Sequence, residues 1–155
     1  MGLDMYIQVS KEMPRNLAKT FMRLESGLRP EDEIFHDFLN EWDKQKQADP
    51  TDTVCLRGIA AYWRKANVIH NWFVQNVQGG NNDCKAYVVS TKKLKSLLRL
   101  CEQAVRTGVI PRQLEPNATF NRSGYALDDC KSTVTMLTTM LERFHDYRYE
   151  YKSSW

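Results

Sequence analysis

The segment AYWRKANVIHNWFVQNVQGGNNDC, residues 61–84, places an indole, two permanent cations and an imidazole close together at Trp63, Arg64, Lys65 and His70. This mixture suits either a difficult piece of hydrophobic core or a site for an anionic ligand. An arginine can bind a phosphate group through two hydrogen bonds, whereas a lysine acts as a point charge. An aromatic ring beside them can stack on a base. The segment therefore predicts a candidate site for a phosphorylated small molecule such as a nucleotide.

A helix must position these groups. The pattern predicts that it begins near Asn67, a suitable N-cap, and ends before Gly79 and Gly80. The start of a helix offers unpaired N–H groups to an anion lying beside Arg64 and Lys65. The alternative is that both cations lie at an exposed strand end and pair with the acidic segment 31–43. The sequence supports the anion site and the exposed strand end equally.

Two polar residues of this helix, His70 and Asn76, fall within its apolar surface when residues 67–78 are placed on a helical wheel. A buried polar group without a hydrogen bond costs about 1–3 kcal/mol. One interpretation is that His70 and Asn76 tie the helix to a neighbouring loop or strand. The other is that one or both face a pocket.

The candidate site also takes in the first strand, because Asp4 could lie at the same edge as Arg64. That aspartate could instead form a structural ion pair with the arginine. Tyr62 or Trp63 would form the stacking wall. The predicted ligand-binding residues are Asp4, Tyr62, Trp63, Arg64, Lys65 and His70.

Catalytic patterns are weak. No glycine-rich phosphate loop accompanies the segment, and the only possible nucleophile set, Cys84 with His70 and Asp83, resembles a catalytic triad by composition alone. The four cysteines have no metal-ligand spacing, so neither a metal nor a cofactor is predicted. We therefore expect a protein that is not an enzyme, with reduced thiols.

The composition is that of one ordinary domain. The chain has 155 residues with 42% hydrophobic and 26% charged residues. The net charge of +3 does not favour a nucleic-acid partner, and the basic face formed by Lys92, Lys95 and Arg99 has no interleaved aromatic rings. Neither a signal peptide nor a membrane span is predicted, so we expect a cytoplasmic protein without a membrane partner.

Hydrophobic periodicity predicts an α+β fold with a small antiparallel or mixed sheet and helices packed on one face. The last strand alternates tyrosine with charged residues, which is typical of a sheet with one wet face. We expect a single domain, 1–155, in which residues 11–53 form a helical insertion. The predicted strands are 3–9, 54–63, 85–89 and 147–152, and the predicted main helices lie near 67–78, 91–105 and 127–144.

Three stretches, MGLDMY at the start, YWRKANVIHNWFVQNVQGGNNDC in the middle and SSW at the end, resemble a family of small proteins encoded by tailed bacteriophages and prophages. The resemblance covers residues 1–9 and 59–105 well. It implies a phage origin and a location in the host cytoplasm. It brings no established activity with it.

Two functions from different classes follow. The first is binding of a nucleotide-like or other phosphorylated small ligand, which in a phage protein could sequester a host-defence signal. The second is a protein-interaction module that inhibits or redirects a host macromolecule. The second would use the acidic helix expected after Pro30 or the tyrosine-rich edge formed by Tyr147, Tyr149 and Tyr151. The oligomeric state is left open.

Overall fold

The computed structural model describes residues 2–14, 53–114 and 125–155. The chain forms two compact units, residues 1–10 with 57–155, and residues 11–56. Of the smaller unit only the ends, 11–14 and 53–56, are described, and both are extended strand. The helical pattern predicted for 11–53 otherwise lies outside the described residues.

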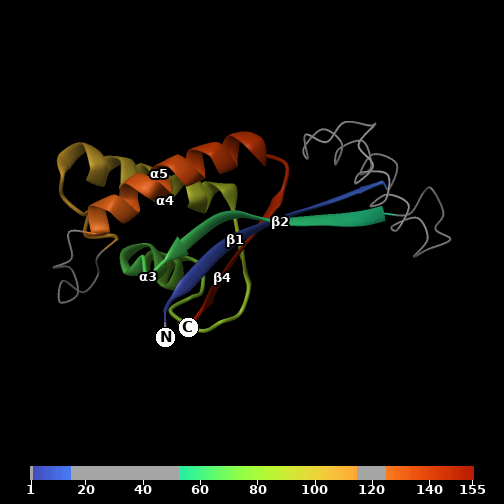
Figure 1. The fold of residues 1–155 in the computed structure, drawn as a ribbon, viewed down its shortest axis with the longest axis horizontal. Coiled ribbons are helices and arrows are strands. Elements are labelled where there is room, and N and C mark those ends of the chain that lie inside the picture. Colours follow the sequence, from blue (N-terminus) through green and yellow to red (C-terminus); the bar gives the residue numbers. More distant parts are fainter. Residues whose placement is uncertain (1, 15–52, 115–124) are drawn as a thin grey trace, which may run out of the picture. The chain divides into compact units, whose positions relative to one another are not determined.

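Four antiparallel strands form one sheet in the order β2-β1-β4-β3 (Figure 1). The first strand pairs with the whole of the last through its first seven residues, from Asp4 opposite Ser154 to Ser10 opposite Arg148. The short β3 pairs with β4 on its other side, with Tyr87 opposite Tyr151. The strands are β1 (Asp4–Pro14), β2 (Thr53–Arg64), β3 (Tyr87–Val89) and β4 (Arg148–Ser154).

Three helices cover one face of this sheet: α3 (Asn67–Asn76), α4 (Thr91–Thr107) and α5 (Tyr125–Arg143). Figure 1 shows α4 and α5 side by side, and α5 also contacts α3. The predicted α+β class, with helices on one face of an antiparallel sheet, is confirmed.

Local sequence explains where the elements begin and end. In β1, Met5, Ile7 and Val9 are buried, as the alternation predicts. The Ser90 side chain accepts a hydrogen bond from the Lys93 N–H at 3.3 Å and so caps α4. Gly108 ends the same helix with a left-handed backbone, φ 71°.

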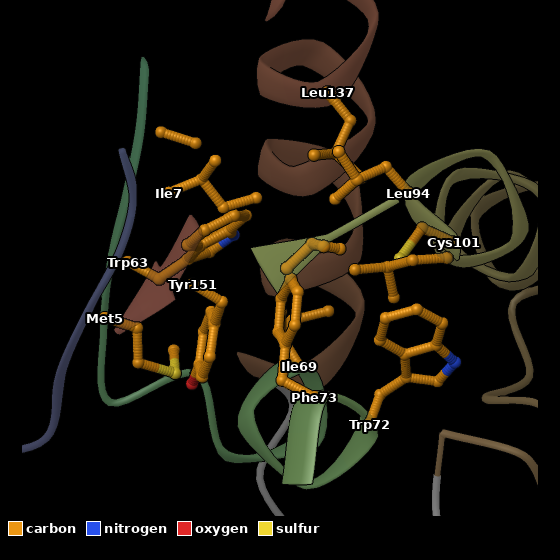
Figure 2. Close-up of a cluster of buried hydrophobic side chains, with 14 of the residues drawn as sticks. Met5, Ile7, Trp63, Ile69, Trp72, Phe73, Leu94, Cys101, Leu137 and Tyr151 are labelled. Carbon is orange, nitrogen blue, oxygen red and sulfur yellow. The ribbon is translucent and has the colours of Figure 1, made fainter. Parts of the chain in front are cut away.

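The core lies between the sheet and the helices. Figure 2 shows side chains from β1, β2, β4 and all three helices meeting there. The rings of Phe73 and Tyr151 stack almost parallel, with centroids 3.9 Å apart and an interplanar angle of 7°. Trp63 packs against Phe73 and donates from Nε1 to Thr133 Oγ1 of α5 at 2.8 Å, which satisfies its one polar atom.

Two of the four cysteines lie together in this core. Cys101 of α4 and Cys130 of α5 are buried, whereas Cys55 and Cys84 are exposed. A hydrogen bond to Cys130, together with burial, raises the pKa of the Cys101 thiol. Such a thiol supplies little thiolate, the reactive form.

We therefore predict that a thiol reagent labels the native protein at Cys55 and Cys84 and spares Cys101 and Cys130. In denaturant all four should react. Mass spectrometry of peptides after a short pulse of alkylation measures the difference. Rapid labelling of Cys130 in the native protein would contradict the packing of α4 on α5.

Asp129 gives the fold a pH dependence. Burial, with the nearby charge of Asp128, raises the pKa of Asp129 to about 6. The folded state therefore binds a proton more tightly than the unfolded chain does, and stability falls as pH rises from about 4 through about 6. Asp129 is only partly buried, so the full two-unit shift must be discounted for solvent screening.

Replacing Asp129 with Asn should raise the free energy of unfolding at pH 7 by about 1–2 kcal/mol and leave it unchanged near pH 3.5. Urea unfolding of both proteins at the two pH values checks this. Asp128→Asn is the control, because that side chain is exposed and pairs with Lys131 at 3.0 Å. An equal gain in both variants would mean that burial of Asp129 is not the cause.

Candidate functional site

The imidazole of His70 joins α3 to the last strand and to the loop that follows α3. It is 5% exposed. Its Nδ1 lies 2.7 Å from the Tyr151 hydroxyl and its Nε2 lies 2.9 Å from Asn82 Oδ1. Burial lowers the pKa of His70, so the neutral ring is the stable form at pH 7. The Tyr151 hydroxyl then donates to Nδ1, and Nε2–H donates to Asn82.

The loop that carries Asn82 is held at several points. Gly79 and Gly80 take left-handed backbone angles, φ 64° and 85°, and the Gly80 N–H donates to the Val74 carbonyl at 2.8 Å to end α3. The Asp83 carbonyl accepts from Gln78 Nε2 and from Ser153 Oγ, each at 3.2 Å. These contacts fix the loop against β4.

A pocket of about 380 Å³ opens beside His70. Its lining combines two rings, three side-chain amides and one aliphatic group, and none of these side chains carries a permanent charge. The Trp155 indole and the His70 ring pack edge to face, with ring centroids 5.8 Å apart and an interplanar angle of 70°. Trp155 is 48% exposed, so much of its ring surface is available. The lining residues are Leu3, Asn67, His70, Asn71, Asn82 and Trp155.

The start of α3 borders this pocket. Asn67, expected to be the N-cap, is instead the first helical residue; Ala66 takes the cap position, and no side chain caps the helix. The reason is that Lys65 adopts φ 58° and its N–H donates to the Leu3 carbonyl at 2.8 Å, which turns the chain one residue earlier. The Asn67 amide is thereby left to line the pocket.

Arg64 and Lys65 lie against the N-terminal segment. A Cβ at Gly2 would meet Lys65 Cε at 3.6 Å and Arg64 Nε at 3.8 Å. Both side chains are exposed, and within the described residues neither takes part in an ion pair. The acidic segment 31–43, their alternative partner, lies outside those residues. The Lys65 N–H bonds to the carbonyl of Leu3, and both Leu3 and Asn67 line the pocket, so the backbone at Lys65 borders it. Neither Arg64 nor Lys65 is among the lining residues, and we call the Arg64–Lys65 segment the rim of the pocket.

The other predicted site residues lie elsewhere. Tyr62 is on the open face of the sheet, where its hydroxyl donates to Asp4 Oδ1 at 2.6 Å and its ring stacks on Tyr6 with centroids 5.8 Å apart. The hydrogen bond to Asp4 raises the pKa of Tyr62. Trp63 is buried in the core. Neither ring lines the pocket; the aromatic wall there is Trp155.

Sequence reasoning missed Trp155, Asn71 and Asn82 as pocket residues. Trp155 follows the last strand and belongs to no periodic pattern, so only its aromatic type marked it. The asparagines lay in a loop and on the polar side of the helical wheel, where solvent exposure is the ordinary expectation.

The possible triad is not assembled. The two ring nitrogens of His70 bond to Tyr151 and Asn82 rather than to Cys84. The Asp83 carboxylate accepts from the Lys85 N–H at 3.1 Å and the Tyr87 hydroxyl at 3.0 Å, so it does not orient the imidazole.

The tyrosine-rich edge is mostly core. Tyr149 and Tyr151 are buried in the helix-covered face of the sheet, so neither offers a contact surface to a partner. A second hollow, of about 430 Å³, lies between α4 and α5. There Lys95 and Arg99 are balanced by Glu102 and Glu142, which does not favour an anion.

The buried neutral His70 gives a testable pH dependence. Because its folded pKa is lowered, the folded state binds fewer protons than the unfolded chain, whose histidine titrates near pH 6.5. The contribution to stability is complete above about pH 6.5 and is lost as pH falls below it.

We predict that His70→Gln loses less stability than the wild-type protein when pH falls from 7.5 to 5.5, although it is less stable at pH 7.5. Thermal unfolding across this range measures the difference, in which the effect of Asp129 cancels. His145→Gln is the matched control, since His145 is an exposed partner of Asp146. Parallel pH profiles for wild type and His70→Gln would show that His70 is not buried as a neutral ring.

Among the described residues, no cluster of histidine, cysteine and carboxylate side chains is arranged to hold a metal ion. No helix of that part of the chain is long and apolar enough to cross a bilayer. Comparison of the chain with protein-family models, with curated proteins and with solved structures gives no match. The candidate site is therefore defined by its own geometry, a neutral pocket of rings and amides with two cations at its rim.

Proposed function

We propose that this protein binds a nucleotide or a similar phosphorylated small molecule, with the ring in the His70 pocket and the phosphate at Arg64 and Lys65. The observation that carries the proposal is the convergence of an indole, an imidazole and three amides on one pocket at the start of α3. We expect the protein to act by holding the ligand, without chemistry on it.

The pocket suits a planar polar ring. Its volume of about 380 Å³ is within the range of small-ligand sites, roughly 300–1,000 Å³. The exposed indole of Trp155 can stack on a base. The amides of Asn67, Asn71 and Asn82 supply donors and acceptors, which the edge of a base requires. A neutral lining favours the base over the phosphate as the group that enters.

The rim suits the phosphate. Arg64 and Lys65 are exposed cations without an ion pair among the described residues, so binding a phosphate breaks no salt bridge there. The start of α3, which no side chain caps, adds partial positive charge. This placement retains Arg64, Lys65 and His70 from the sequence prediction and replaces Tyr62 and Trp63 with Trp155.

The resemblance to phage proteins supplies the biological setting of the proposal. A phage protein that binds a nucleotide in the host cytoplasm could sequester a host-defence signal. The alternative, an interaction module that redirects a host macromolecule, loses the support of Tyr149 and Tyr151 because both are buried. Its other proposed surface, the acidic helix expected after Pro30, lies outside the described residues.

The test distinguishes the contact made by the base from the contact made by the phosphate. Calorimetric titration with a panel of nucleosides and of mono-, di- and cyclic nucleotides should identify ligands that bind the wild-type protein. Arg64→Ala should lower the affinity for nucleotides by about ten-fold or more, because a charge-assisted hydrogen bond contributes about 1.5–3 kcal/mol. It should leave the affinity for nucleosides unchanged. Trp155→Ala should lower the affinity for nucleosides and for nucleotides, because both would lose the stacking contact with the indole.

Arg106→Ala is the matched control, since Arg106 is an exposed cation in the last turn of α4 and does not line the pocket. It should bind every ligand as the wild-type protein does. If no member of the panel binds the wild-type protein, the nucleotide proposal fails. If Arg64→Ala and Arg106→Ala lose affinity equally, the phosphate does not lie at the rim.

A further inference from the structure

The side-chain amide of Asn82 has one defined orientation in the pocket, with its oxygen toward His70. The Tyr151 hydroxyl is buried and lies 2.7 Å from His70 Nδ1, and Ser153 is its other side-chain partner. Burial lowers the pKa of His70 and the hydrogen bond to Asn82 raises it, as an acceptor for the Nε2 proton does. The one proton of the neutral imidazole is then on Nε2, which lies 2.9 Å from Asn82 Oδ1. A protonated ring would also donate from Nε2, so the amide oxygen of Asn82 faces His70 in either charge state.

The amide nitrogen of Asn82 is consequently available to a ligand. Asn82 lines the pocket and its side chain is exposed. In the part of the chain that the structure describes, no protein atom accepts a hydrogen bond from its Nδ2. The loop contacts at Gly79, Gly80 and Asp83 hold the residue in place. The pocket therefore presents an N–H₂ group whose direction is set by the hydrogen bond between Asn82 Oδ1 and His70 Nε2.

Building on the proposed function, we infer that Asn82 is a specificity-determining residue that selects bases with a keto oxygen over those with an exocyclic amino group. A keto oxygen accepts from the Nδ2–H₂ group. An amino group in the same place would put two donors face to face and leave both without a partner, which is the strongest form of discrimination by a polar site. The chemical class is a 6-keto purine or 4-keto pyrimidine nucleotide.

The experiment uses two ligand pairs, inosine monophosphate with adenosine monophosphate and uridine monophosphate with cytidine monophosphate. The members of a pair differ in the keto or amino group and in the proton on the adjacent ring nitrogen, and the Asn82 variant tests which contact decides the preference. The wild-type protein should bind the keto member of at least one pair about ten-fold or more tightly. Asn82→Asp keeps an acceptor for His70 Nε2–H and so preserves the loop, but it replaces the donor with a second acceptor. It should reduce the keto preference to near one or reverse it.

Asn81→Asp is the matched control. Asn81 is exposed and adjacent but does not line the pocket, so the variant adds the same charge next to the site. General repulsion of the phosphate lowers the affinity for both members of a pair, whereas the ratio within a pair reports the base contact. The control should therefore keep the wild-type ratio.

The outcomes separate this inference from the function on which it rests. Equal binding of both members by the wild-type protein, or preference for the amino member, overturns the role of Asn82 and leaves nucleotide binding in place. A keto preference that survives in Asn82→Asp, or that is lost equally in Asn81→Asp, also overturns it. Failure of the wild-type protein to bind any of the four ligands overturns both proposals.

Discussion

Tyr151 makes the contact on which the rest of the larger unit depends. It lies on β4, between β1 and β3, and its ring stacks on Phe73 of α3 at 3.9 Å. Its hydroxyl reaches His70 on the same helix at 2.7 Å. One side chain thus joins α3 to a central strand through both a flat apolar contact and a buried hydrogen bond. Burial raises the pKa of Tyr151 well above its usual value, so the hydroxyl remains a donor.

This contact also orders the loop after α3. The other ring nitrogen of His70 is hydrogen-bonded to Asn82 in this loop. Ser153, two residues from Tyr151, donates to the Asp83 carbonyl at 3.2 Å. A loop of residues 79–86 with two glycines would otherwise be free to take many conformations. Breaking any one of these hydrogen bonds leaves a buried polar group without a partner, which costs about 1–3 kcal/mol. The hydrogen bonds of the network therefore stabilise one another. The pocket wall is therefore a consequence of core packing, not a separate structure.

The periodic parts of the sequence were sufficient to predict the larger elements. The α+β class, the four strands and the three main helices follow from apolar spacing in segments such as Met5–Ile7–Val9 and from local stop signals such as Ser90 and Gly108. Helix boundaries differed by one or two residues where backbone geometry decided them. The start of α3 is the example, because nothing in the identity of Lys65 indicates that it adopts φ 58°.

The candidate site was less accessible to sequence reasoning because its members come from distant segments. His70 could be recognised as a polar residue on an apolar surface that needed a partner, and the structure gives it partners from a loop and a strand while leaving it at a pocket. Trp63 and Trp155 could not be ranked in the same way. Both are tryptophans near strand ends, and only the three-dimensional arrangement puts one in the core and the other at the pocket.

The arrangement separates the part of the site that is tied to folding from the part that is not. His70 is buried and hydrogen-bonded to Tyr151, so a change that removes its ring alters stability as well as shape. Arg64 and Lys65 lie exposed, so substitutions there should have little effect on the fold, because an exposed cation contributes little to stability. In the proposed nucleotide complex, the base contact can therefore stay constant while the strength of phosphate binding changes. We therefore expect substitutions at the two rim cations to tune affinity and substitutions in the network to alter which base is accepted.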